Sequence, residues 1–180
     1  MTRNISLTLL TMVGIETAAQ ENNNLKAFNL HGQVFELFLE DSSEKPLMDV
    51  PIEIWCGDEL ITKLESGPKG KYSVNLTYYP KYQIKFGKAP YVSKIVEIDA
   101  KGFSRSAEFG IVNLDLDISI FKDENFMGMD FMNFTPVAKL YFNKSKGVIV
   151  WDDQYCDQMN ARMCGILQAN GKVYKPKKKK

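Results

Sequence analysis

Short runs of alternating hydrophobic and polar residues occupy the chain from about residue 28 to residue 121. In residues 111–121, for example, every second side chain is Val, Leu or Ile, while the residues between them are Asn, Asp or Ser. A period of two is the signature of a β-strand with one buried and one solvated face. Runs of this kind predict strands near 30–39, 50–56, 59–65, 71–78, 82–87, 92–99 and 111–121.

Turn-forming residues separate these runs, as in Gly67-Pro68-Lys69-Gly70 and Gly87-Lys88-Ala89-Pro90. Many short strands divided by Gly, Pro and Asp at close intervals are typical of a β-sandwich. No helix of useful length fits between residues 28 and 122. We therefore expect an all-β fold over 28–122, with seven strands in two packed sheets.

The order of several short motifs resembles the carboxypeptidase regulatory-like domain. They are Gly32-Gln33-Val34, Pro46 to Ile54, Gly70 to Val74, Tyr82 to Phe86 and Tyr91 to Lys94. The resemblance covers about residues 30–100 and implies a transthyretin-like (prealbumin-like) sandwich. Pro68-Lys69 and Pro90 depart from it, because members of that family usually carry Asp or Asn before the Gly-x-Tyr and Gly before the later Tyr.

The pattern changes after Phe121. Residues 123–136 contain three Met and three Phe without a regular period, which predicts an extended connection anchored by apolar side chains. Two interpretations remain open for this Met/Phe-rich connection. Its side chains pack on the sandwich as a satellite core, or they form an adaptable strip that binds a partner.

A hairpin and a short helix are predicted in the extension at 137–170. Strands at 137–142 and 148–151 flank a polar turn that ends in Gly147. Asp152 or Asp153 is placed to cap a helix that follows. Its apolar stripe is narrow, so the helix must dock on another surface. The stripe consists of Tyr155, Met159, Met163 and Ile166.

The two ends of the chain have a different composition. Residues 1–20 begin with Arg3, continue through an apolar stretch and close on Thr17-Ala18-Ala19-Gln20, the layout of a secretory signal peptide. An untargeted N-terminal segment is the alternative, because Ser6, Thr8 and Thr11 dilute the apolar stretch. Residues 21–27 form a polar leader, and no later run has the ~18 apolar residues of a membrane-spanning helix. We expect an exported protein, periplasmic or associated with the outer membrane.

Charge is distributed unevenly along the chain. The formal net charge is +1, but six of the 23 basic residues are lysines within 172–180, so the remaining 17 are outnumbered by 22 acidic residues. The lysine-rich tail at 171–180 is either a solubilising end or a site of attraction to anionic lipid, lipopolysaccharide or an acidic partner. Nucleic acid is not an expected partner, because the body of the protein lacks a basic face with stacking aromatic residues.

The usual catalytic signatures are missing from the sequence. The single histidine, His31, cannot alone supply a His-based metal site, and we interpret it as a partly exposed strand residue. Hydrolases of 5-hydroxyisourate with this fold need several histidines and a Tyr-Arg-Gly-Ser terminus, which this chain lacks. The pairs Asp115 with Asp117 and Asp152 with Asp153 are interpreted as solvated carboxylates. No catalytic residue, cofactor or metal is expected.

Three cysteines are too few for a disulfide framework. In a helix, Cys156 and Cys164 would lie about 12 Å apart along the axis, too far to bridge. We expect small buried thiols, with Cys56 pointing inward. A disulfide from Cys56 to one of the other two is the alternative.

Together these features favour a non-catalytic scaffold or adaptor of the bacterial cell envelope that binds a protein partner through its C-terminal extension. The layout is similar to that of small exported Bacteroidota proteins, which suggests surface assembly, gliding or type IX secretion. The candidate partner-binding residues are Phe126, Met127, Met129, Phe131, Met132, Tyr155, Met159, Met163, Lys177, Lys178, Lys179 and Lys180. The alternative function is a carbohydrate-binding module, with Trp55 and Tyr91 as the contact residues.

Overall fold

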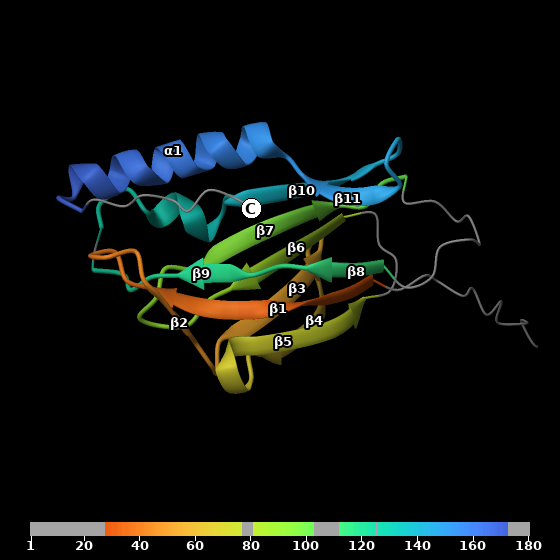
Figure 1. Cartoon of the computed structure of the whole chain (residues 1–180), viewed down its shortest axis with the longest axis horizontal. Helices are drawn as coiled ribbons and strands as arrows, with labels where there is room; N and C mark the ends of the chain where they lie inside the picture. The colour runs from red at the N-terminus through yellow and green to blue at the C-terminus, as the bar shows by residue number, and fades with distance from the viewer. Residues whose placement is uncertain (1–27, 77–80, 103–111, 125, 173–180) are drawn as a thin grey trace, which may run out of the picture.

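Two β-sheets packed face to face, with one α-helix beside them, make up the computed structural model over the residues it describes, 28–76, 81–102, 112–124 and 126–172 (Figure 1). The predicted signal peptide, the leader and residues 173–180 lie outside these described residues. The all-β sandwich predicted from the sequence is confirmed, including the C-terminal hairpin and the single helix.

The first sheet is built around β1 (Phe28–Leu37). One side of β1 pairs with two antiparallel strands, β5 (Lys71–Leu76) and the short β2 (Glu44–Pro46). The other side pairs with two parallel strands, β8 (Val112–Asp115) and β9 (Ile118–Ile120).

The second sheet has six strands in the order β11-β10-β7-β6-β3-β4. These are β3 (Pro51–Cys56), β4 (Glu59–Glu65), β6 (Lys81–Phe86), β7 (Lys94–Asp99), β10 (Ala138–Asn143) and β11 (Val148–Trp151). Neighbouring strands of this sheet are antiparallel, with one exception. β10 and β7 pair in parallel, from Ala138↔Val96 to Tyr141↔Asp99. The predicted hairpin is therefore the edge of this sheet.

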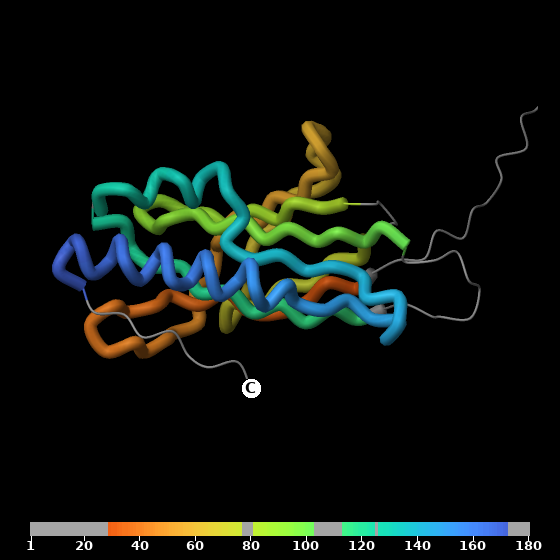
Figure 2. Tube along the Cα trace, turned by 90° about the horizontal axis from the view of Figure 1, so that it is seen from above, coloured from red at the N-terminus to blue at the C-terminus, as the bar shows by residue number. Residues whose placement is uncertain are grey.

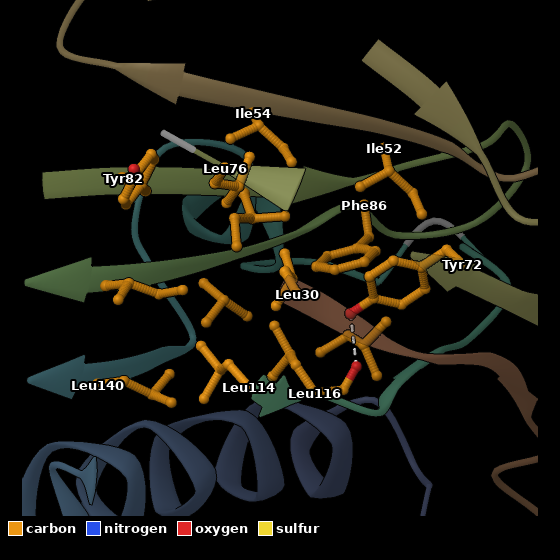
Figure 3. Packing of buried hydrophobic residues seen from close by; sticks show 14 of the residues in the cluster. Leu30, Ile52, Ile54, Tyr72, Leu76, Tyr82, Phe86, Leu114, Leu116 and Leu140 are labelled. Atoms are coloured by element: carbon orange, nitrogen blue, oxygen red, sulfur yellow. Dashed lines mark hydrogen bonds between the residues drawn. The ribbon is translucent and has the colours of Figure 1, made fainter. Parts of the chain in front are cut away.

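The first core lies between the two sheets and contains the inward members of the alternating runs (Figure 3). Leu30, Ile52, Ile54, Ile84 and Phe86 are fully or almost fully buried there. Burying one such side chain stabilises the fold by roughly 1.5–3 kcal/mol. The period of two thus accounts for which side of each strand faces inward.

The run at 111–121 forms two strands instead of the single strand predicted. The break falls at Leu116 and Asp117, where the Asp117 carboxylate accepts the backbone N–H of Gln33 at 2.8 Å. The buried Tyr72 hydroxyl donates to the carbonyl oxygen of Leu116 at 2.5 Å (Figure 3). A side chain at Gly32 would meet that same carbonyl, because an added Cβ would lie 2.1 Å from its oxygen. The glycine of the first motif therefore permits this close approach.

Helix α1 (Asp153–Ala169) follows β11 and is capped at both ends. The Asp152 carboxylate accepts the N–H of Tyr155 at 3.0 Å, as a helix N-cap should. At the other end Gly171 adopts φ 76°, and the N–H of Lys172 reaches the carbonyl oxygen of Leu167 at 2.9 Å. This is the Schellman arrangement that commonly ends a helix.

A second core closes one end of the sandwich. It joins Leu37 at the end of β1 and Phe121, just after β9, to the Met/Phe-rich connection and to the C-terminal half of α1. Its buried members are Leu37, Leu39, Val92, Phe121, Phe126, Met129, Met132, Met163 and Leu167. The extension therefore supplies part of the interior.

Two further local expectations were wrong. The connection is not uniformly extended, because it turns at Gly128 (φ 88°) and contains a 3-10 helix, η2 (Asp130–Asn133). Cys56, the last residue of β3, and Cys164, on α1, are only partly buried, so the expectation of buried thiols fails for both. All three cysteines lie in the described part of the chain, and no disulfide joins them. Cys156 is buried.

No helix within the described residues is long and apolar enough to cross a membrane.

Candidate functional site

The Met/Phe-rich connection runs antiparallel to α1, so that residues 127–136 and the helix form a paired unit (Figure 2). At one end the side-chain amide of Asn170 exchanges two hydrogen bonds with the backbone of Met127, both 3.2 Å long. At the other end the Tyr155 hydroxyl donates to the carbonyl oxygen of Pro136 at 2.7 Å. We call residues 127–136 the connection ridge.

An arginine covers the middle of the connection ridge. The guanidinium carbon of Arg162 lies 3.9 Å from the centroid of the Phe131 ring, which is a close cation–π contact. Arg162 itself is exposed, while Phe131 is partly buried. The ridge therefore presents a positive group over an aromatic ring on its outer side.

Five of the candidate partner-binding residues face the interior and are not available at the surface. They are Phe126, Met129, Met132, Met159 and Met163, all buried. For these residues the satellite-core interpretation of the Met/Phe-rich connection describes the structure. The stripe predicted for α1 is also rotated slightly: Cys156, Met159, Met163 and Leu167 are buried, and Tyr155 and Ile166 lie at its margins.

Two apolar side chains of the connection ridge point into solvent. Met127 is 83% exposed and Phe134 is 84% exposed. Met127 was among the sequence candidates, whereas Phe134 was not. The aperiodic Met/Phe pattern does not distinguish Phe134 from its buried neighbours, because η2 and the following turn decide which side chains face inward. Lys177, Lys178, Lys179 and Lys180 lie outside the described residues.

A buried carboxylate joins the start of α1 to the second sheet. Glu97 on β7 is buried and binds the ammonium groups of Lys81 at 2.9 Å and Lys139 at 3.7 Å. The Lys139 ammonium also lies 4.3 Å from the centroid of the Tyr155 ring. Burial, together with the charge of Glu97, raises the pKa of Tyr155. The raised pKa extends to higher pH the range over which the protonated phenol donates to Pro136.

The lysine-rich tail begins beside acidic residues. Lys172, its first lysine, binds Glu124 at 2.8 Å and Glu40 at 3.5 Å. The hydrogen bond to Glu124 is the main cause that raises the pKa of Lys172. The tail thus leaves the body of the protein close to Asn170 and Met127, at one end of the connection ridge.

A second candidate site lies on the outer face of the first sheet. Ser73, His31 and Asp115 stand opposite one another on β5, β1 and β8, and all three line an open hollow of about 480 Å³. The order matches a Ser-His-Asp triad. His31 Nδ1 lies 3.6 Å from Asp115 Oδ1, where the His31 and Asp115 side chains are 40% and 75% exposed.

The geometry of this row does not suit nucleophilic catalysis. The Ser73 hydroxyl accepts from the Asn29 amide at 3.5 Å and makes no hydrogen bond to His31 among the described residues. The carboxylate of Asp115 is too exposed to fix the imidazole firmly. The backbone N–H of Gln33, at the edge of the hollow, is already bound to the Asp117 carboxylate. No group of His, Cys, Asp or Glu in the described residues is arranged to hold a metal ion.

The candidate carbohydrate residues do not share a hollow. Trp55 lies on the outer face of the second sheet, with Gln83 and Lys85 beside it. Tyr91 lines a different hollow, together with residues of the connection such as Met127 and Asp130. Burial, followed by the charge of Glu36, raises the pKa of Tyr91. Sequence reasoning identified Trp55 but missed its polar neighbours, because cross-strand register brings them together.

No protein-family model and no curated sequence matches the chain. Solved structures with a similar arrangement include 3-chlorocatechol 1,2-dioxygenase from Rhodococcus opacus 1CP, with 10% identity, a TM-score of 0.41, and coverage of 57% of this chain and 63% of the dioxygenase. The major plantain pollen allergen Pla l 1 has 12% identity and a TM-score of 0.40 over 53% of this chain and 94% of the allergen. The minor pilin GBS52 of Streptococcus agalactiae has 12% identity and a TM-score of 0.39 over 54% of this chain and 45% of the pilin.

These similarities are partial, and the chain spans less than two thirds of the length of that dioxygenase. The neighbours include enzymes, an allergen and pilin proteins. They therefore do not distinguish an enzyme from a binding or structural protein.

Proposed function

We propose that this protein is a non-catalytic, exported scaffold or adaptor of the bacterial cell envelope, built on a carboxypeptidase regulatory-like sandwich. The sandwich provides rigidity, and the C-terminal extension binds a protein partner. The process that we propose, surface assembly, gliding or type IX secretion, rests on the sequence resemblance alone. The observation that carries the proposal is the outward position of Met127 and Phe134 on a ridge whose other apolar side chains are buried or partly buried.

Leaving these two side chains in water has an energetic cost. Burying a Met or Phe side chain is worth roughly 1.5–3 kcal/mol, so a partner that covers both would gain several kcal/mol. Their support is also fixed, since Asn170 holds the backbone at Met127 and Tyr155 holds it at Pro136. A preorganised surface loses little conformational entropy when a partner binds. Exposed Arg162 adds a charged contact of the kind enriched in binding hot spots.

The lysine-rich tail would supply a second contact. Because it starts beside Met127, a partner with an apolar groove next to an acidic surface could engage the ridge and the tail together. Linking two weak contacts in this way raises the overall affinity. Anionic lipid or lipopolysaccharide is the alternative ligand of the tail, with each lysine near such a surface worth ~1 kcal/mol.

Co-purification from the native membrane fraction tests the proposal. The wild-type chain, extracted with mild detergent, should elute with a stoichiometric protein partner. The double variant Met127→Ser/Phe134→Ser should lose that partner, whereas the control Met48→Ser, which changes an exposed Met outside the extension, should keep it. Elution of the wild type alone, or equal retention by the double variant, would contradict the proposal.

The absence of catalysis is tested separately on the Ser73, His31 and Asp115 row. We expect no covalent labelling of the purified chain by a fluorophosphonate probe, because Ser73 lacks a hydrogen-bonded base. Labelling that disappears in both Ser73→Ala and His31→Ala would overturn this part of the proposal.

A further inference from the structure

A groove crosses the outer face of the second sheet and adjoins, at Ser93, the hollow that residues of the connection ridge line. It consists of two adjoining hollows of about 290 and 300 Å³ that share Glu53 and Lys85 as lining residues. Trp55 and Gln83 line one hollow, and lysines line much of the other. Most of the lining residues come from β3 and β6 and from the turns that follow these two strands.

Strand register explains why these side chains meet. Trp55 on β3 stands opposite Gln83 on β6, and Glu53 stands opposite Lys85. Because Ile54 and Ile84 between them point into the first core, the residues of the groove must point outward. On the other flank Glu53 also stands opposite Lys63 of β4, and their charged groups lie 3.1 Å apart.

Several polar groups in the groove have no partner within the described part of the chain. The Trp55 indole N–H, the Gln83 amide and the Lys85 ammonium form no hydrogen bond or ion pair there. Asp58 at the rim is likewise unpaired in that part. An aromatic ring surrounded by convergent, unused donors and acceptors is the usual chemistry of a small-ligand site. Sugars fit it, since their C–H faces stack on aromatic rings and their hydroxyls need planar polar groups.

The positive charge of the hollow of about 300 Å³ indicates which class of ligand the groove binds. Lys63, Lys85 and Lys88 line it, while Glu53 is the only acid among its lining residues and is already bound to Lys63. The Lys88 ammonium donates to the carbonyl oxygen of Met48 at 3.1 Å, which orients it without neutralising its charge. A carboxylate placed at this end would therefore meet two lysines that have no acidic partner among the described residues.

We propose that this groove binds an oligosaccharide that carries a carboxylate. One sugar stacks on Trp55 and uses Gln83 and Asp58 for its hydroxyls, and the carboxylate of an adjacent sugar binds Lys85 and Lys88. No residue of the connection ridge lines either hollow, so either function can fail while the other holds. Tyr91, the second candidate in the original carbohydrate hypothesis, has no part in it.

Solution NMR of the full chain tests the site with an internal reference. We would titrate 15N-labelled protein with galacturonic acid trimer and, as the neutral match, galactose trimer. The indole resonance of Trp55 and the amide resonance of Gln83 should shift with the acidic trimer. The indole resonance of Trp151, which packs against the first core, should not. Affinity for the neutral trimer should be at least tenfold weaker.

Two variants complete the test. Trp55→Ala should lower affinity for the acidic trimer at least tenfold, whereas Tyr141→Ala should leave it unchanged. Tyr141 is an exposed aromatic on β10 of the same sheet but lines neither hollow. Absence of any shift with both trimers, or equal binding by Trp55→Ala, would overturn the site. Equal affinity for the neutral trimer would overturn the role assigned to the lysines.

Discussion

The two cores of this protein are built from different kinds of sequence. The first core, between the sheets, takes every second residue from strands that alternate regularly. The second core takes single residues from the end of β1, from the residue after β9, from an aperiodic connection and from one face of α1. Large apolar side chains of the sheets and their loops are at most half exposed, whereas Met127 and Phe134 beside the irregular core are more than four-fifths exposed. We infer that binding surfaces arise more readily where packing is not dictated by a repeat.

Removal of the second core should have the largest effect. Deleting residues 123–180 strips the cover from Leu37, Leu39 and Phe121 and leaves the edge of β7 unpaired. Since domains of this size are stable by only about 5–15 kcal/mol, the remainder should lose cooperative unfolding. Urea titration followed by circular dichroism measures this. Deleting only residues 173–180, which belong to neither core, is the control. A folded 1–122 fragment would mean that the first core is self-sufficient.

A matched pair of substitutions compares the two cores directly. Leu30 in the first core and Leu167 in the second are both fully buried, so each Leu→Ala change should cost ~3 kcal/mol. If the cores unfold together, both variants should lower the same single urea transition by similar amounts. In Leu167→Ala, the circular dichroism signal of the helix could instead be lost at lower urea concentration than the tryptophan fluorescence changes. That result would show that the two cores unfold independently.

A buried lysine close to both cores should destabilise the fold at neutral pH. Lys94 packs against Phe121, and burial lowers its pKa from the ordinary 10.5 to about 8. Below pH 8 the ammonium is charged in both states and its burial is unfavourable. From pH 8 to 10.5 only the unfolded chain keeps the proton, so the free energy of unfolding rises with pH. The depressed pKa corresponds to roughly 3 kcal/mol.

Replacing this lysine removes the penalty. Lys94→Met should raise the free energy of unfolding at pH 7 by up to about 3 kcal/mol. It should also flatten the rise between pH 8 and 10.5 relative to wild type. Lys71→Met, which changes an exposed lysine of β5, should do neither. Urea titrations at several pH values compare the two variants with wild type. A Lys94→Met variant that is less stable than wild type at pH 7 would show that the buried ammonium stabilises the fold.

The clamp at the end of α1 should have a smaller effect. Asn170→Ala removes both hydrogen bonds to Met127 and the one to Ile166, at a cost of about 1–2 kcal/mol. Gln168→Ala, an exposed change in the last turn of the helix, is the control. The thermal unfolding midpoint measures the stability of both variants. Hydrogen exchange of the Met127 amide should accelerate only in Asn170→Ala. Unchanged exchange there would mean that the connection ridge does not depend on the clamp.

The predictability of each region follows its periodicity. The strands from Pro51 to Phe86 could be placed from alternation alone, because side chains two apart share a face whatever lies around them. The break at Leu116 could not, since it depends on Gly32, Tyr72 and Asp117 meeting across the sheet. For the same reason Phe134 and the surroundings of Trp55 were missed. Their exposure and neighbours are set by tertiary packing and by strand register.

Site-specific photo-crosslinking tests the central claim, that the connection ridge contacts a partner. A benzophenone amino acid would replace Phe134 in the full chain expressed in its native cells, with the same residue at Met48 as the control. We predict a discrete cross-linked species of partner plus protein from position 134 and none from position 48. No cross-link at 134, or the same species from both positions, would contradict the claim.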